Sequence, residues 1–507
     1  MNIHSLLSHH GVSRNPFSEE DAQTDQVFKT HCIDNTYHVG WDKIFGDPAD
    51  PSTSIVFGEK GAGKTAIRLQ IARHVSDYNA RHPEHQLFLI EYDDFNPFLD
   101  RFRARMGRRH RRADRMLATW RLWDHMDAIL CEGVTKLTSA ILADSNHPDA
   151  IARDRIRKLT QHQRRDLLLL DACYDDTSTE PFADRWNRLR KQLGFGVLNS
   201  YLPWVVGWTV TLGVAALFAY VHWFADSPAV EGEAARRLMA DLPWWGYLLV
   251  IVAGWLPLWL KFVKRFATAA GIARRLRVGS RSQSALRKAL MNFSTSDLSG
   301  QPLPNRDRTD DRYALLGKFQ NVLSTLGFSG ILVLVDRVDE PHLINGSAEL
   351  MRALLWPLLD NKFLRHPGMG IKMMLPVELS RFIEREDQEF YQRARLDKQN
   401  MIPSLQWTGE ALFDLANSRL DACKQEQASP SLPNFFDDSV TKQRLLEGFR
   451  SLRVPRHLFK FLYRLLVAHC NAHTDQEPSW KISNHMFESV LAVYQRELEA
   501  VDRGTGT

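Results

Sequence analysis

The glycine-rich stretch Gly58-Glu59-Lys60-Gly61-Ala62-Gly63-Lys64-Thr65 constrains the fold of this chain more than any other feature. It fits the pattern G-x-x-x-x-G-K-[ST], the Walker A motif of phosphate-binding loops. The run Ser54–Phe57 before it is typical of a buried strand. The segment Ala66–Ala72 after it has helical spacing. The motif therefore lies between a strand and a helix, as a phosphate-binding loop requires.

This context predicts a role for the glycine, lysine and threonine positions of the motif. Gly58, Gly61 and Gly63 let backbone N–H groups turn toward phosphate oxygens, and the start of the helix adds its positive dipole end. Lys64 is expected to reach the β- and γ-phosphates, and the Thr65 hydroxyl to hold Mg²⁺. The alternative is a chance glycine-rich turn, which the strand and helix on either side disfavour. The predicted ligands are ATP and Mg²⁺.

Two long segments without charged residues are the second informative feature. Leu202–Ala225 has no Asp, Glu, Lys or Arg over 24 residues, and Leu242–Leu260 has none over 19. Both reach the ~17–25 residues that span a bilayer, and tryptophans lie toward the ends of each. Buried helices of a soluble core are the alternative, but such helices usually show a polar stripe. Pro257 predicts a kink or an early end of the second span.

The charges beside these segments predict the topology. Basic residues precede the first span at 185–191 and follow the second at 261–281, where no acid occurs. The connector 226–241 carries a net charge of −2. By the positive-inside rule, both outer flanks are cytoplasmic and the connector is outside. We expect a multi-pass protein of the inner (plasma) membrane, with both termini and the main body in the cytoplasm.

The composition indicates a soluble body attached to this anchor. A chain of 507 residues suggests about three domains, and its mean hydropathy is −0.32. Five scattered cysteines without a C-x-x-C pattern argue for reduced thiols and against a disulfide or zinc framework. The stretch Arg101–Arg115 contains eight arginines. It is open whether this run contacts anionic lipid, binds nucleic acid or is a solvated helix or loop.

A second nucleotide-site motif is predicted at Gly330–Pro341. The run Ile331–Val335 has the residues of a buried parallel strand and is followed by acids. In P-loop enzymes, the Asp at the end of such a strand belongs to the Mg²⁺ shell. In this chain that residue is Asp336. A general base for water requires a carboxylate a few residues on, so Glu340 is the first candidate and Asp339 the second. An ordinary core strand with a polar exit is the alternative.

The two motifs lie on either side of the membrane segments in the sequence. Both motifs must contact one Mg–nucleotide, so both must lie on the same side of the membrane. Two spans satisfy this requirement, because the second brings the chain back to the side from which it started. Further parallel strands are predicted at Leu87–Tyr92, Gly370–Val377 and Lys398–Trp407, with a crossover helix at Ala348–Phe363. Other expected helices are Ala113–Ser145 and Asp149–Asp175, and at the C-terminus Ala411–Cys423, Gln443–Phe449, Arg456–Cys470 and Ile482–Glu499.

A P-loop domain split by a two-span hairpin resembles the KAP family of P-loop NTPases, in the STAND group related to AAA+ ATPases. Asp336-Arg337-Val338-Asp339-Glu340 is similar to the D-x-h-D-E motif of the NACHT branch. The resemblance covers about 50–405, followed by a helical C-terminus like a lid. It implies that Arg456, in the Pro-Arg motif, senses the γ-phosphate, and that Arg381 is a second sensor. Many relatives carry an acid where this chain has Arg337, so slow hydrolysis or nucleotide switching is expected.

The predicted fold class is α/β: a P-loop NTPase parallel sheet split by a transmembrane helical hairpin, with a C-terminal helical lid. The expected parts are 1–195, the hairpin 196–265 with spans at about 202–225 and 242–263, 266–407, and the lid 408–507. The expected function is a membrane-anchored ATPase that switches, assembles or signals, and the family resemblance extends this to bacterial defence. Its expected partners are the lipid bilayer, further copies of itself, and a protein or nucleic-acid trigger.

Two other functions are weighed against this one. A membrane-tethered nucleic-acid motor or loader is the first alternative, and the run Arg101–Arg115 is its only support. A transporter is the weakest, because the two spans contain no acid or base that would form a pathway.

Overall fold

The computed structural model describes residues 1–144, 147–196, 198–223 and 244–502. The chain forms two compact units. The first unit comprises Met1–Asn96, Arg112–Thr119 and Phe328–Thr507, and the second comprises Pro97–Arg111 and Trp120–Gly327. The four-part division stays a prediction, since compactness alone does not test it.

A five-stranded parallel sheet forms the centre of the first unit, in the order β2-β3-β4-β1-β5. Its strands are β1 (Ser54–Gly58), β2 (Gln86–Tyr92), β3 (Phe328–Val335), β4 (Met369–Pro376) and β5 (Asn400–Ile402). Side chains on both faces of β1 and β4 are buried, which explains their largely apolar sequences. The chain between β2 and β3 forms almost all of the second unit. The predicted class is confirmed: an α/β fold with a parallel sheet, interrupted after β2 by a helical hairpin.

Several predicted elements are shorter or interrupted. The last strand was expected at Lys398–Trp407, but β5 ends at Ile402 because the next residue, Pro403, has no N–H to continue the ladder. The crossover 348–363 is α16 (Ala348–Leu355), a 3₁₀ turn that contains Pro357, and α17 (Asn361–Leu364). The other helices around the sheet are α2 (Trp41–Phe45), α3 (Lys64–Arg81), α5 (Ala113–Leu117), α18 (Glu378–Ile383) and α19 (Gln388–Ala394).

Four helices follow the sheet: α20 (Gly409–Ala422), α21 (Lys442–Leu452), α22 (Pro455–Ala472) and α23 (Asn484–Asp502). They agree with the predicted lid helices to within a few residues at each end. The N-terminus, with α1 (Ile3–His9) and a π-helical turn at Phe28–Cys32, shares one hydrophobic core with them. Asp25 and Arg419, both almost fully buried, form an ion pair of 2.6 Å between this segment and α20. The first 33 residues therefore belong structurally to the C-terminal helices, which the sequence did not predict.

Lys372 is the unusual residue of the sheet. It lies in the middle of β4, paired with Ser54 on one side and Leu334 on the other, and its side chain is fully buried. Its Nζ has no hydrogen-bond partner among the residues that the structure describes. Burial lowers the pKa of Lys372 to about 7, because a charged ammonium is strongly disfavoured away from water.

We expect Lys372→Met to stabilise the protein at neutral pH. The folded-state pKa of Lys372 lies below its ordinary 10.5. As pH falls from 10.5 toward 7, Lys372 therefore binds a proton in the unfolded chain but not in the folded protein, and the free energy of unfolding decreases. Methionine has no titratable group and so removes this pH-dependent loss of stability. The free energy of unfolding at pH 7.5 should rise by ~1–4 kcal/mol. Thermal unfolding in detergent at pH 7.5 and pH 10 measures the effect. The difference in unfolding temperature between variant and wild type should be smaller at pH 10 than at pH 7.5. A variant that is less stable than the wild type at both pH values would contradict this account.

The second unit is a helical body. Its helices are α4 (Asn96–Arg105, whose first residue is in the first unit), α6 (Leu122–Leu142), α7 (Arg153–Lys158), α8 (Gln161–Tyr174), α9 (Phe182–Gln192), α13 (Gln283–Met291), α14 (Thr295–Leu298) and α15 (Thr309–Thr325), with the apolar pair α10 and α12. The predicted helices 113–145 and 149–175 are each divided in two. Buried Asp127 of α6 pairs with buried Arg312 of α15 at 3.1 Å. Such a pair fixes the packing of helices through geometry, whatever its net stabilisation.

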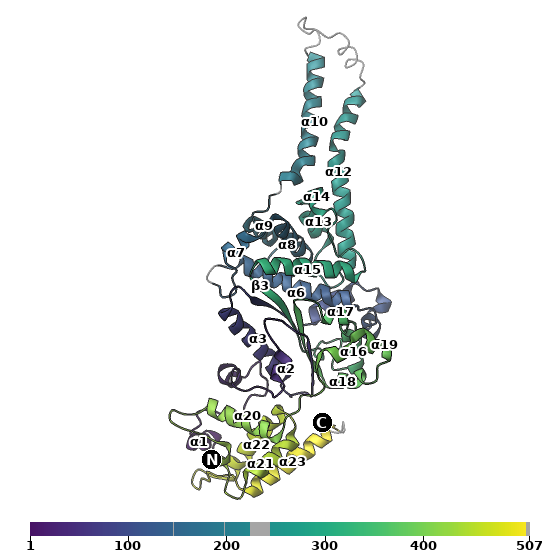
Figure 1. Ribbon diagram of the computed structural model, residues 1–507. Coiled ribbons are helices and arrows are strands. Elements are labelled where there is room, and N and C mark those ends of the chain that lie inside the picture. Colours follow the sequence, from purple (N-terminus) through teal and green to yellow (C-terminus); the bar gives the residue numbers. More distant parts are fainter. Residues whose placement is uncertain (145–146, 197, 224–243, 503–507) are drawn as a thin grey trace. The chain divides into compact units, whose positions relative to one another are not determined.

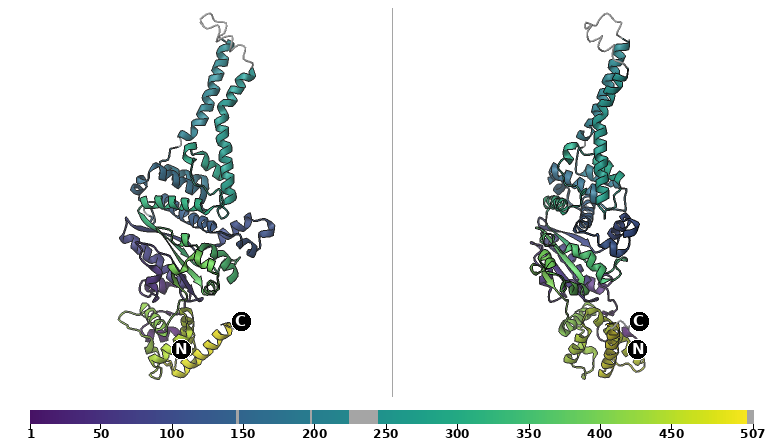
Figure 2. Two further views of the ribbon diagram at one scale, coloured as in Figure 1. Left: turned by 45° about the vertical axis from the view of Figure 1, so that its right-hand side comes forward. Right: turned by 90° about the vertical axis from the view of Figure 1, so that its right-hand side faces the viewer.

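Helices α10 (Leu198–Trp223) and α12 (Trp244–Arg275) run side by side (Figures 1 and 2). Gly207 lies against the Trp255 ring, whose Nε1 donates to the Thr211 hydroxyl at 3.0 Å. Within the described residues, the segments long and apolar enough to cross a membrane are Ser200–Ala219 and Trp245–Arg275. Of an 18-residue apolar stretch in each, 6% and 17% are buried. Core helices would be mostly buried, so the membrane interpretation is favoured. The second helix continues through Pro257 without ending there, while the connector 226–241 lies outside the described residues.

Candidate functional site

The glycine-rich loop joins β1 to α3, as the sequence predicted. Gly61 and Gly63 have φ of +90° and +96°, a backbone region that side chains other than glycine rarely adopt. A Cβ atom at Gly61 would lie 2.6 Å from the Cβ of Arg456. The loop therefore requires glycine at this position for two separate reasons: its backbone conformation and the close approach of α22.

Lys64, the first residue of α3, folds back over the loop. Its Nζ donates to the carbonyl oxygens of Gly58 at 2.8 Å and Glu59 at 3.0 Å. Burial lowers the pKa of Lys64, and the charges of Asp339 and Asp336 oppose that shift. The ammonium is thus held at the mouth of the loop, close to carboxylates, as a phosphate-binding lysine needs to be.

Thr65 and Asp336 meet, although 271 positions separate them in the chain. The Thr65 hydroxyl donates to Asp336 Oδ2 at 3.3 Å. Asp336 is 2% exposed, and burial raises its pKa, which the Arg68 guanidinium opposes. One carboxylate and one hydroxyl oxygen suit Mg²⁺, which takes few protein ligands and completes its shell with water and phosphate oxygens.

Arg68 is a site residue that the sequence analysis missed. It lies one turn into α3, is almost fully buried, and its Nε is 3.3 Å from Asp336 Oδ2. Its Nη1 is 2.9 Å from Asp93 and 3.4 Å from Glu91, both at the end of β2. Arg68 thereby places one positive charge among three acids, beside Thr65. An arginine one turn after a Walker A threonine, with acids at the end of the next strand, is the signal that was available.

The two candidate bases border the same cavity but differ in their surroundings. Asp339 is half-buried, whereas the Glu340 carboxylate is 59% exposed and lies 3.7 Å from the Arg337 Nε. Arg337 has φ of +58°, which costs an ordinary residue of order 1–3 kcal/mol. Its Nη2 also donates to Gln23 Oε1. Arg337 thus contacts one candidate base and the N-terminal segment.

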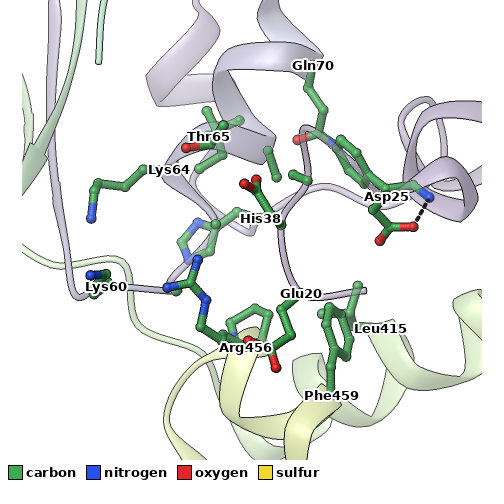
Figure 3. Close-up of a pocket in the computed structure, with 18 of the residues that line it drawn as sticks. Glu20, Asp25, His38, Lys60, Lys64, Thr65, Gln70, Leu415, Arg456 and Phe459 are labelled. Carbon is green, nitrogen blue, oxygen red and sulfur yellow. Dashed lines mark hydrogen bonds between the residues drawn. The ribbon is translucent and has the colours of Figure 1, made fainter. Parts of the chain in front are cut away.

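The two arginines implied as sensors lie in different surroundings. Arg456, the second residue of α22, borders the cavity, and its backbone N–H donates to the Gly61 carbonyl at 3.4 Å. Its buried Nε has no hydrogen-bond partner within the described part of the chain. Figure 3 shows it pointing into the space that Lys60, Lys64 and Thr65 border. Arg381 is exposed on α18 and is not among the residues that line this cavity.

The rest of the cavity wall comes from segments that the sequence did not connect with the site. The N-terminal segment contributes Ala22, Phe28, Cys32, Thr36 and His38, and the C-terminal helices contribute Leu415 and Phe459. Trp407, which joins the sheet to α20, donates from its Nε1 to the Ala62 carbonyl at 2.9 Å. The cavity therefore has a polar end at the loop and a partly apolar end between the N-terminal segment and α20–α22.

Comparisons with protein-family models, with curated proteins and with solved structures gave no match for this chain. The functional argument consequently depends on the geometry of this site and on the two apolar helices.

Proposed function

We propose that this protein is a membrane-anchored P-loop ATPase that acts as a nucleotide-dependent switch. The observation that carries the proposal is the meeting of Lys64, Thr65 and Asp336 at one cavity that both the N-terminal segment and α22 also line. The order of the parallel strands and the resemblance to KAP-type NTPases support the same class. ATP with Mg²⁺ is the proposed ligand.

The polar end of the cavity would hold the triphosphate. Backbone N–H groups of the loop and the start of α3 face anions, and Lys64 supplies a compact positive charge. Thr65 and Asp336 would hold Mg²⁺, whose chemistry is to neutralise charge that develops on the phosphates. Asp339 and Glu340 are the residues that would orient or deprotonate water, and Arg456 would contact the γ-phosphate.

The apolar end would hold the nucleobase. Phe28 of the N-terminal segment and Phe459 of α22 both line the cavity, and apolar walls with a few polar groups are typical of small-ligand sites. The Thr36 hydroxyl is 2.7 Å from the Ser418 hydroxyl of α20, so the N-terminal segment and the C-terminal helices are joined beside this end. A ligand that contacts both would favour one arrangement of these helices over another, which is the physical requirement for a switch.

The membrane part of the proposal depends on α10 and α12. If the pair crosses the bilayer as a hairpin, the chain leaves β2 and returns to β3 on the same side of the membrane. The basic residues beside the two helices indicate that this side is the cytoplasm. We therefore propose a protein of the inner membrane with its nucleotide site in the cytoplasm. The homo-oligomer and the trigger stay predictions.

The nucleic-acid motor, which depends on the run Arg101–Arg115, stays the alternative. Two arginines of the run Arg101–Arg115 serve the packing of the second unit: Arg101 pairs with Asp176, and Arg105 donates to the carbonyls of Ala273, Leu276 and Gly279. These guanidinium groups are occupied by protein partners, so the run offers fewer free charges than its composition suggested.

Membrane vesicles of both orientations test the proposal in one experiment. An impermeant photoreactive ATP analogue should label the protein in inside-out vesicles, where the cytoplasmic face is accessible, and leave it unlabelled in right-side-out vesicles. Excess Mg–ATP should suppress the labelling at least tenfold, and carbonate washing should leave the protein in the membrane. Equal labelling in both orientations, or release by carbonate, would contradict the proposal.

A further inference from the structure

The chain after the second apolar helix is strongly basic. From Lys261 to Phe293 it contains nine lysines and arginines and no acid. Most of these cations are used within the second unit: Arg275 pairs with Asp307, Arg277 with Asp124, and Arg281 with Asp175. Lys261 and Arg265 donate to Ser200, Phe293 and Ser294.

Two cations of α13 are different. Arg287 and Lys288 form no ion pair with any residue of the ranges that the structure describes. The Arg287 guanidinium lies 5.0 Å from the centre of the Phe262 ring of α12, an arrangement that holds the charge beside an apolar surface. A positioned cation without an acidic partner is available to an anionic ligand.

A hollow of about 360 Å³ adjoins Arg287, between α12 and α13. Its wall consists of Phe266, Ser282, Gln283, Ser284 and Arg287. The two serine hydroxyls are 3.0 Å apart. The hollow thus combines a guanidinium and hydroxyl groups, which hydrogen-bond to phosphate oxygens, with one aromatic wall.

A second hollow also borders Ser284; it is lined by residues of α9 and α13, among them Lys288. The residues that line it are Phe182, Ala183, Trp186, Asn187, Ser284, Ala285, Lys288, Ala289 and Asn292, and none of them is acidic. Both hollows beside Ser284 therefore contain one cation and no carboxylate.

The apolar surface of α12 continues past its first lysine to this hollow. Phe262, Val263 and Phe266 are 39%, 54% and 48% exposed, although Lys261 precedes them. Phe266 lies about one helical turn beyond the predicted end of the span at 263. If α12 crosses the membrane, these side chains reach the depth at which headgroups meet acyl chains.

We propose that the hollow formed by Phe266, Ser282, Ser284 and Arg287 binds the phosphate of an anionic phospholipid of the bilayer. The acyl chains lie along the exposed Phe262, Val263 and Phe266, which a soluble phosphate would leave uncovered. Basic pockets at the cytoplasmic end of membrane helices are suited to such headgroups. The inference rests on the proposed membrane anchoring but is independent of nucleotide binding.

Lipid retention by the full-length protein tests this site. Protein purified in mild detergent is incubated with phosphatidylglycerol or phosphatidylcholine, and bound lipid is counted by native mass spectrometry. The wild type should retain at least fivefold more phosphatidylglycerol than phosphatidylcholine. Arg287→Gln should lose this preference, and Arg287→Lys should keep most of it. Arg274→Gln, which removes an exposed α12 charge outside the hollow, should retain the wild-type preference.

Each other outcome identifies a different error. The site would be overturned if wild type and Arg287→Gln retained phosphatidylglycerol equally. It would also be overturned if Arg287→Lys and Arg274→Gln both lost the preference for phosphatidylglycerol. Full displacement of the lipid by millimolar inorganic phosphate would show a soluble-anion site, which also overturns it. Release of the wild type from membranes by carbonate would instead refute the anchoring itself.

Discussion

Glu340→Gln is expected to bind Mg–ATP as the wild type does and to lose turnover by ~10²–10⁴-fold, the usual contribution of a general base. The Glu340 carboxylate borders the cavity and is more than half exposed, so water in the cavity has access to it. Glutamine keeps its size and removes its basicity. Single-turnover hydrolysis with enzyme in excess over ATP measures the chemical step without product release.

Asp339→Asn is the matched variant, because Asp339 borders the same cavity and its charge acts on Lys64. If Glu340 is the base, Asp339→Asn should retain turnover within about tenfold. Asp336→Asn should instead weaken the Mg²⁺-dependent part of ATP binding, since it changes the proposed metal shell. Full activity of Glu340→Gln would refute the assignment to Glu340. Absence of hydrolysis in the wild type, with intact ATP binding, would favour a switch that requires its trigger.

The sheet and the loop were predictable because their signals are local. Residues 54–57 and 331–335 are continuous apolar runs, and each ends at a motif whose chemistry requires the end of a parallel strand. The pairing of Thr65 with Asp336 then follows from the fold, since carboxyl ends of parallel strands meet at one edge. Pro403 was the available signal for the early end of β5, and it was overlooked.

The far end of the cavity was not predictable in this way. The ion pair of Asp25 with Arg419 and the contact of Thr36 with Ser418, which is 382 positions away, join segments far apart in the chain. No periodicity or motif marks either residue, and only tertiary packing brings Phe28 and Phe459 to one wall. The partners of Arg101 and Arg105 could not be predicted for the same reason: composition counts charges but does not show which of them are paired.

Binding of Mg–ATP by purified wild type and Lys64→Ala, measured by titration calorimetry in detergent, tests the central claim most directly. Removing the ammonium beside the phosphates should weaken binding tenfold or more, at about 1.4 kcal/mol per tenfold. Lys29→Ala, a change at an exposed lysine outside the cavity, should bind as the wild type does. Unchanged affinity in Lys64→Ala, or a wild type that binds no Mg–ATP, would contradict the nucleotide site on which the account depends.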